Sequence, residues 1–195
     1  MQWIERTLNS IRKLNEKHET IVVDNNSQDD TIRFIENKFP EIILLTENEN
    51  HGFGKANNIG IKKALDEGAD YVFLLNQDAY VEANTIGKLI EVMEYDKKIG
   101  IASPIHLNGD GSALDKLFST YVAPKLSNDP CLFMSDSYTQ QLAKYYKIDF
   151  VNAAAWLIKR ECIEKVGLFD SIFYHYGEDV NYCQRISYHG FKLSI

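Results

Sequence analysis

The sequence predicts an α/β fold in which helices cover both faces of a mostly parallel central sheet. Short apolar runs alternate with segments of helical periodicity, an alternation typical of parallel sheets. Polar clusters follow several of the apolar runs, and ligand sites in open α/β sheets favour the edge at which strands end. The pattern therefore predicts one ligand site at that edge of the sheet.

Composition narrows the class of protein. The 195 residues suffice for one domain with a full core, and 45% hydrophobic with 25% charged residues is ordinary for a globular protein. A net charge of −7 without a Lys/Arg block argues against nucleic acid as a partner. The cysteines Cys131, Cys162 and Cys183 are widely spaced, which favours neither a zinc site nor a disulfide framework and is simplest in a reducing cytoplasm.

No apolar run approaches the ~20 residues that a membrane span requires. A flanking segment could still hold the chain peripherally at the inner face of the membrane. We therefore expect a cytoplasmic location with that reservation.

Apolar residues at helical spacing open the chain and predict a first helix: Ile4, Leu8, Ile11 and Leu14. Residues 19–24 follow as a strand, and the continuous apolar run predicts that this strand is fully buried. Capping groups at 29–31 open a helix that stops before Pro40, and residues 42–45 form the next strand.

Glycines flank the segment 50–60, which predicts a tight loop running into a helix through Ile61 and Leu65. Residues 70–75 then form a third strand, and 86–93 another helix. This order of elements continues the α/β alternation.

The second half begins with a strand at 99–104 that stops at its proline. Regularity is lost at 106–149, which we interpret as a variable insertion bordering the site. A strand within 150–158, a short helix near 161–166 and a helix following Glu178 complete the expected elements.

The first polar cluster follows the strand at 19–24. Asp24 could accept hydrogen bonds from a nucleoside, although Asp24 and Ser27 could equally shape a turn and cap the next helix. In the glycine-flanked segment, Asn57 could donate to a diphosphate at a point where the backbone comes close.

The second cluster is Asn76-Gln77-Asp78, at the end of the third strand. Asp78 could bind Mg²⁺ or Mn²⁺, because both ions prefer oxygen ligands and also bind diphosphate oxygens. A helix-capping role for Asp78 is the structural alternative.

The third cluster places Glu178 and Asp179 behind an aromatic segment, where a carboxylate can act as a catalytic base. The alternative is that both acids merely stabilise the start of a helix. Trp156 could stack on a sugar or fill the core.

Taken together and in order, four segments resemble the family 2 glycosyltransferases: 22–31, 50–60, 75–78 and 177–185. The resemblance spans nearly the whole chain. The Asn76-Gln77-Asp78 version is most similar to bacterial members that build polysaccharide, including rhamnosyltransferases.

The resemblance implies a GT-A fold, a nucleotide-diphospho-sugar donor, a divalent cation (Mg²⁺ or Mn²⁺) and inversion at the anomeric carbon by direct displacement. It implies that Asp78 is the metal ligand and Asp179, with Glu178 beside it, the general base. Asp24 would contact the base or ribose. The full set of residues expected to bind the donor is Asp24, Asn26, Gly52, Asn57, Asn76 and Trp156.

The chain departs from the family pattern at both ends. Family members carry an apolar strand before the first helix, whereas Met1 here leads almost straight into that helix. Because that strand normally lies inside the sheet, we expect an open sheet edge through which two copies could pair. The family also continues beyond 191–195, so we expect 1–195 to be a single catalytic domain truncated at both ends.

The resulting hypothesis is a metal-dependent transferase that moves a sugar to a glycan or lipid-linked acceptor in bacterial surface polysaccharide synthesis. The alternative is a non-catalytic sugar-nucleotide-binding or assembly domain inactivated by truncation. A nucleotidyltransferase would usually show a Gly-rich, Lys/Arg-containing segment after its first strand, and the sequence shows none.

Overall fold

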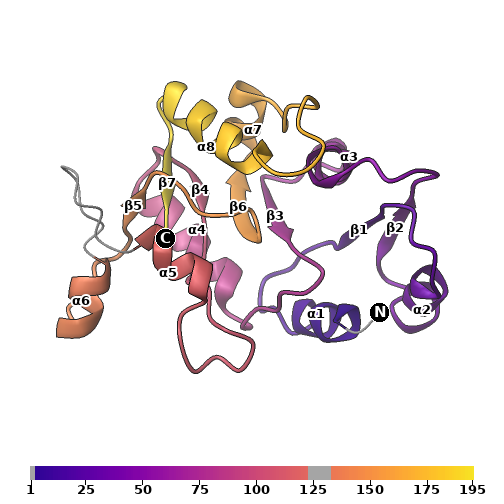
Figure 1. The fold of residues 1–195 in the computed structure, drawn as a ribbon, viewed down its shortest axis with the longest axis horizontal. Coiled ribbons are helices and arrows are strands. Elements are labelled where there is room, and N and C mark those ends of the chain that lie inside the picture. The colour runs from indigo at the N-terminus through magenta and orange to yellow at the C-terminus, as the bar shows by residue number, and fades with distance from the viewer. Residues whose placement is uncertain (1–2, 123–132) are drawn as a thin grey trace.

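The structure is a computed structural model that describes residues 3–122 and 133–195. Within these ranges the strands form two sheets (Figure 1). The smaller sheet pairs β1 (Ile21–Asp24) with β2 (Ile43–Thr46) in parallel. The larger sheet has the order β3-β6-β4-β7-β5. Its strands are β3 (Tyr71–Leu75), β4 (Ile99–Ala102), β5 (Lys147–Ile148), β6 (Ala155–Lys159) and β7 (Lys192–Ser194).

The larger sheet is mixed, which corrects the expectation of a mostly parallel sheet. Strands β3, β4 and β7 run in the same direction: β6 is antiparallel to both β3 and β4, and β7 is parallel to β4. Strand β5 also runs against β7. Strand β6 begins beside the end of β4, where Ala102 pairs with Leu157, and therefore runs in the opposite direction.

Helices flank both sheets (Figure 1). They are α1 (Ile4–Ile11), α2 (Thr31–Lys38), α3 (Phe53–Asp66), α4 (Thr85–Tyr95), α5 (Lys116–Val122), α6 (Phe133–Thr139), α7 (Arg160–Val166) and α8 (Glu178–Tyr188). Helices α1 and α2 pack on the smaller sheet in a cluster that includes Leu8, Ile35 and Phe39. The layered α/β architecture predicted from the sequence is confirmed.

Alternate side chains of β6 enter two different cores, as the twofold period of a strand requires. Trp156 and Ile158 pack with residues of α7 and α8, including Cys162 and Tyr182. Leu157 packs on the other face with α4. The larger sheet is therefore covered on both faces.

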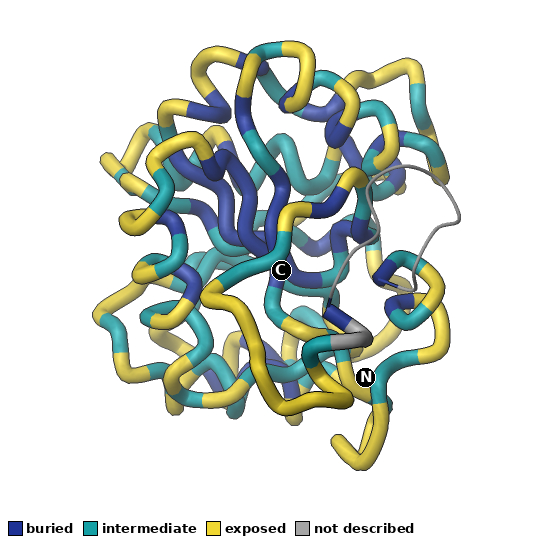
Figure 2. The backbone as a smooth tube through the Cα atoms, turned by 90° about the vertical axis from the view of Figure 1, so that its left-hand side faces the viewer, coloured by how far each residue is buried: buried dark blue, intermediate teal, exposed yellow. Residues whose placement is uncertain are grey.

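Burial differs sharply between the two sheets. All residues of β4 and β6 are buried, whereas Ile21, Val22 and Val23 of β1 are only half-buried. In Figure 2 the buried segments gather accordingly in the larger sheet. The prediction that β1 is fully buried is wrong, because in the part of the chain that the structure describes β1 pairs with β2 alone and its other edge stays open.

Three further details differ from or complete the sequence analysis. Helix α3 begins already at Phe53, so most of the predicted 50–60 loop is helical. The segment 106–149 contains α5, α6 and β5, and the final strand β7 was not predicted. Cys162 and Cys183 are buried free thiols, while Cys131 lies outside the described residues. Among the described helices, none has both the length and the apolar character needed to cross a membrane.

Candidate functional site

The end of β1 is bonded to the loop that precedes α3. The Asn25 side chain donates from Nδ2 to Asn50 Oδ1 at 2.9 Å and to the Gly52 carbonyl at 3.3 Å. Its Oδ1 accepts the His51 N–H at 2.9 Å. One amide thus joins the first polar cluster to the glycine-flanked segment.

Asp24 and Asn26 shape the turn that follows β1. Asp24 is 4% exposed, and its Oδ2 accepts the Ser27 N–H at 3.0 Å. Asn26 adopts a left-handed backbone with φ +69°. The turn-shaping alternative for Asp24 and Ser27 is therefore realised.

The glycine-flanked segment also touches the loop before α8. Gly52 has φ +78°, and a Cβ there would lie 2.0 Å from the Tyr174 carbonyl oxygen. The Tyr174 hydroxyl donates to the Asn50 carbonyl at 3.2 Å. At Gly54, a Cβ would lie 3.2 Å from Phe169 Cβ and 3.6 Å from Glu178 Cβ. Glycine is required at position 52, because its backbone is left-handed and lies against the backbone of Tyr174.

The end of β3 carries the second cluster and is anchored on both sides. The Asn76 N–H donates to the Ala154 carbonyl at 2.9 Å, directly before β6. The Gln77 carbonyl accepts the Thr7 hydroxyl of α1 at 2.8 Å. Asp78 follows as an exposed residue at this edge of the sheet.

The third cluster starts α8. Gly177 precedes the helix with φ +95°, and Glu178 is 5% exposed, with an Oε2 that has no hydrogen-bond partner among the described residues. Asp179 is partly exposed, and its Oδ1 accepts the Val180 N–H at 2.8 Å. Both acids lie in the first turn, where the helix dipole favours negative charge.

A family model described as Glycosyl transferase family 2 matches residues 1–167. The chain belongs to this family. It is 25% identical over 172 residues to a low-salt glycan biosynthesis hexosyltransferase of Haloferax volcanii, covering 86% of this chain and 52% of the relative. It is 24% identical over 185 residues to the dTDP-rhamnosyl transferase RfbF of Shigella flexneri, covering 95% and 60%. The chain thus spans little more than half the length of these relatives.

Solved structures agree on the fold. GalNAc-T7, crystallised with UDP, GalNAc and Mn²⁺, matches with a TM-score of 0.73 at 18% identity, over 98% of this chain and 39% of that one. The mannosyltransferase PcManGT of Pyrobaculum calidifontis, in complex with GDP-Man and Mn²⁺, matches with a TM-score of 0.67 at 19% identity, over 98% and 50%. The expected GT-A fold of the family is confirmed.

The residues at the β3 edge permit a cation but do not enclose one. Across residues 3–122 and 133–195, no three His, Cys, Asp or Glu side chains gather into a metal-binding group. Mg²⁺-type ions are nevertheless often held by one or two carboxylates together with substrate phosphates. The exposed Asp78 fits such a shared site, in which a family 2 donor would bring the other oxygens.

Two sequence assignments need correction or refinement. Trp156 is fully buried and stacks on Phe169 with ring centroids 6.2 Å apart, so the prediction that Trp156 binds the donor is wrong and its core role is realised. Asn57 donates to the Phe53 carbonyl within its own helix at 2.9 Å. The next residue, Asn58, is hydrogen-bonded to both backbone groups of Phe169. Its Nδ2 donates to the Phe169 carbonyl at 2.8 Å, and its Oδ1 accepts the Phe169 N–H at 2.9 Å.

Two asparagines outside the predicted set of site residues, Asn25 and Asn58, join segments that lie far apart along the chain. The only sequence signal for the two asparagines was their position beside residues already singled out.

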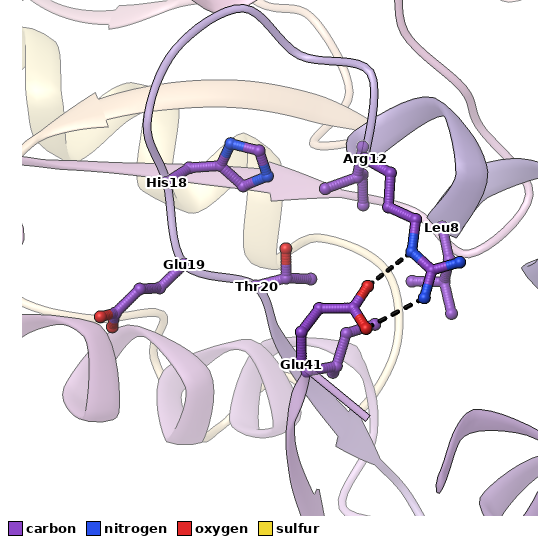
Figure 3. Close-up of a pocket in the computed structure, with 8 residues that line it drawn as sticks. Leu8, Arg12, His18, Glu19, Thr20 and Glu41 are labelled. Carbon is purple, nitrogen blue, oxygen red and sulfur yellow. Dashed lines mark hydrogen bonds and ion pairs between the residues drawn. The ribbon is translucent and has the colours of Figure 1, made fainter. Parts of the chain in front are cut away.

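A pocket of about 150 Å³ lies away from this edge, at the amino ends of β1 and β2 (Figure 3). Arg12 spans it with two contacts to Glu41, Nε to Oε1 at 2.5 Å and Nη2 to Oε2 at 2.9 Å. His18 and Thr20 line the other side. None of the predicted family 2 site residues lines this pocket, so we assign it no part in the site.

Proposed function

We propose that this family 2 domain transfers a sugar, with inversion, from a nucleotide-diphospho-sugar to a glycan or lipid-linked acceptor in surface polysaccharide synthesis. One observation carries the proposal: the loop before α3 contacts both the end of β1, through Asn25, and the segment before α8, through Tyr174. A carboxylate stands at the end of β1, just after β3 and at the start of α8. The reaction needs three functions at one place, namely nucleoside recognition, diphosphate binding and proton removal.

Each carboxylate receives one of these functions. Asp24, at the end of β1, contacts the base or ribose, and Asn26, Gly52, Asn57 and Asn76 border the donor. Asp179 accepts the proton of an acceptor hydroxyl while that oxygen bonds to the anomeric carbon and the bond from this carbon to the diphosphate oxygen breaks. Glu178 lies buried beside Asp179 at the start of α8.

Asp78 is the residue that would hold Mg²⁺ or Mn²⁺. When bound, the cation neutralises charge that develops on the departing diphosphate. The exposed position of Asp78 at the end of β3 supports this role, because a donor diphosphate can reach an exposed carboxylate.

The activities of similar proteins guide the choice of donor. One relative is a dTDP-rhamnosyl transferase, another a poly-beta-1,6-N-acetyl-D-glucosamine synthase, and a structural neighbour was solved with GDP-Man. We therefore expect dTDP-rhamnose, UDP-N-acetylglucosamine or GDP-mannose to be consumed, and dTDP-rhamnose is the first to test.

The decisive experiment compares Asp179→Asn with the matched control Asp66→Asn, a neutralised exposed carboxylate on α3. Release of nucleoside diphosphate is measured with each donor and Mn²⁺. Loss of a general base lowers transfer by about 10²–10⁴-fold, whereas the control keeps wild-type turnover. Equal activity of the Asp179 variant and the wild type would refute the assignment.

A second measurement separates catalysis from binding. Donor binding is followed by thermal shift with and without Mn²⁺ in the wild type and in Asp78→Asn. We expect Mn²⁺ to strengthen donor binding to the wild type and to leave donor binding to Asp78→Asn unchanged. Donor binding without turnover, in a chain of the relatives' full length, would instead support a non-catalytic binding or assembly domain.

Location and assembly follow as lesser proposals. We place the reaction in the cytoplasm, at the inner face of the membrane when the acceptor is lipid-linked. Open sheet edges invite pairing of two copies, and β2 offers its outer edge in the described part of the chain. Sedimentation equilibrium of the isolated chain tests this, and a monomer at all concentrations would exclude it.

A further inference from the structure

The segment before α8 presents apolar side chains to solvent beside the proposed base. Ile172, Tyr174 and Tyr176 occupy alternate positions and are 79%, 63% and 80% exposed. Phe173, between the first two, is half-buried, and its ring lies 3.1 Å from the position that a Cβ on Gly177 would take. Exposed apolar residues are normal when they are scattered singly, whereas three in one short segment indicate a contact surface.

Contacts and chain geometry fix this segment at the proposed site. On the donor side, the Tyr174 hydroxyl donates to the Asn50 carbonyl at 3.2 Å, and the Tyr174 carbonyl oxygen would lie 2.0 Å from a Cβ on Gly52. On the other side, Tyr176 precedes Asp179 by three residues, a length of chain that spans at most about 11 Å. The exposed Tyr176 ring is therefore within reach of a sugar whose hydroxyl contacts Asp179.

The backbone at Tyr176 is strained. Tyr176 has φ +67°, in the left-handed region that bulky residues rarely adopt, and Gly177 follows with φ +95°. The His175 and Tyr176 ring centroids lie 3.9 Å apart, so the two exposed rings support each other. Strained backbone clusters at ligand sites, where it positions a side chain before the ligand binds. Glycine would adopt this backbone without strain, which provides a test of what the ring itself contributes.

The charge of the segment selects among possible occupants of this surface. Residues 166–184 contain no Lys or Arg, whereas Asp170, Glu178 and Asp179 are acidic. Anionic membrane surfaces and the phosphates of lipid carriers are usually bound by Lys and Arg, and acidic residues repel both. A sugar ring is neutral, and its C–H faces can pack on an aromatic ring while its hydroxyls stay in water. The surface therefore favours a neutral sugar.

We propose that Ile172, Tyr174 and Tyr176 form the acceptor surface of the transferase, with the Tyr176 ring stacked on a sugar ring of the acceptor. The inference rests on the proposed function and narrows its acceptor to a glycan, recognised through its sugar rings and not through a lipid phosphate. Tyr176 is a positioning residue, because the proton of the attacking hydroxyl still passes to Asp179. Tyrosine suits this task, since it offers a large rigid surface and loses little conformational freedom on binding.

The first test measures glycan binding without turnover. The probes are an α-rhamnose disaccharide and a β-1,6-linked tetramer of N-acetylglucosamine, chosen from the activities of two relatives. Calorimetry gives the Kd of each with and without Mn²⁺ and the nucleoside diphosphate. Tyr176→Ala should raise the Kd of the glycan that binds about tenfold, whereas Tyr176→Phe should keep it, because stacking needs the ring and not the hydroxyl.

Tyr188→Ala is the matched control for this measurement. Tyr188 is 87% exposed at the end of α8, so its removal should leave the Kd unchanged. Failure of both probes to bind the wild type would overturn the proposal. Equal binding by Tyr176→Ala and the wild type would do the same.

A glycine at position 176 separates the contribution of the ring from that of the backbone. Tyr176→Gly removes the left-handed strain and should raise the urea midpoint of unfolding, yet it should weaken glycan binding as much as Tyr176→Ala does. Tyr176→Ala keeps the strained backbone, so its midpoint should stay near that of the wild type. A ring that only stabilises the fold would lower the midpoint in both variants, and this result would refute the acceptor role.

Vesicle sedimentation tests the rival occupant, and turnover separates this inference from the proposed function. Vesicles of phosphatidylcholine and phosphatidylglycerol should show no binding that depends on Tyr176, and vesicle binding lost in Tyr176→Ala would identify a membrane surface and overturn the proposal. If no donor turns over while glycan binding still depends on Tyr176, the proposed function fails and the glycan surface stands. If a donor turns over with the same acceptor KM in the wild type and Tyr176→Ala, only the glycan surface fails.

Discussion

The two sheets of this domain contain similar apolar strands in different surroundings. Strand β6 lies between β3 and β4, with helices on both faces, and every residue in it is buried. Strand β1 has an equally continuous apolar run, yet Ile21, Val22 and Val23 remain half-buried beside an open edge. An apolar run specifies that a strand forms, whereas its burial depends on what pairs with both of its edges.

The largest expected effect compares the same substitution in the two sheets. Ile158→Ala in β6 removes a fully buried side chain and should lower the free energy of unfolding by about 2–5 kcal/mol. Ile21→Ala in β1 should cost about 1–2 kcal/mol, because that side chain already contacts water. Urea denaturation of both variants measures the difference. Equal costs would mean that β1 is as well packed as β6, contrary to the comparison.

The next effect concerns Gly52, where the loop before α3 lies against the Tyr174 backbone in the segment before α8. Its backbone, φ +78° and ψ 176°, lies in a region open almost exclusively to glycine, so Gly52→Ala should cost about 1–3 kcal/mol in backbone strain alone. The clash with the Tyr174 carbonyl adds to this cost. Gly68→Ala is the control, since Gly68 has φ +87° but open space around it.

The Gly52 comparison is made by thermal and urea unfolding. The Gly68 variant should lose only the left-handed penalty of about 1–2 kcal/mol. A Gly52 variant no less stable than the Gly68 variant would show that the segment around Tyr174 moves aside at little cost. The loop before α3 would then be only loosely packed against the segment before α8.

Much of the fold could be predicted from the sequence, because most elements carry local signals. The apolar run at 70–75 and the helical pattern at 86–93 correspond to β3 and α4. Strand direction could not be predicted in the same way. Whether β6 runs parallel or antiparallel to β4 depends on which end of β4 the chain reaches when β6 begins. No local sequence pattern records this.

For the candidate site, the sequence predicted positions better than contacts. The predicted polar clusters do follow β1 and β3 and open α8, and contacts of the loop before α3 join the first cluster to the segment before α8. The expectation for Trp156 was wrong because the sequence around a tryptophan near the start of a strand does not distinguish a side chain that faces a ligand from one that faces the core. Asn58 was missed because its partner, Phe169, lies 111 positions away along the chain.

That asparagine provides a smaller test of how α3 is tied to the segment before α8. Asn58→Ala removes two hydrogen bonds to the Phe169 backbone and should lower the free energy of unfolding by about 1–3 kcal/mol. Asn57→Ala removes one bond within α3 and replaces asparagine by the best helix former, so little change is expected. Amide exchange at Phe169 should accelerate only in the Asn58 variant. Retained protection there would argue that packing alone fixes this contact.

The smallest expected effect compares how the stability contributed by an ion pair beside each sheet depends on pH. At the end of α4, Asp96 Oδ2 contacts Lys192 Nζ of β7 at 2.6 Å and accepts the Tyr145 hydroxyl at 2.7 Å. The hydrogen bond from Lys192, followed by those from Tyr145 and the Lys98 backbone, lowers the pKa of Asp96 well below its ordinary value. The smaller sheet has the Arg12–Glu41 pair, whose side chains are 41% and 51% exposed.

A carboxylate with a lowered folded-state pKa stabilises the fold above its unfolded pKa, about 3.9, and this contribution is lost as the pH falls through the folded value. Wild type should therefore exceed Asp96→Asn in stability by a constant amount from pH 7 to about pH 5, and the difference should shrink below about pH 4. Urea midpoints between pH 7 and pH 3 measure it, with Asp66→Asn as the exposed control. Glu41→Gln should show a weaker dependence, because solvent screens an exposed pair. A pH-independent difference for Asp96→Asn would mean that its hydrogen bonds matter and its charge does not.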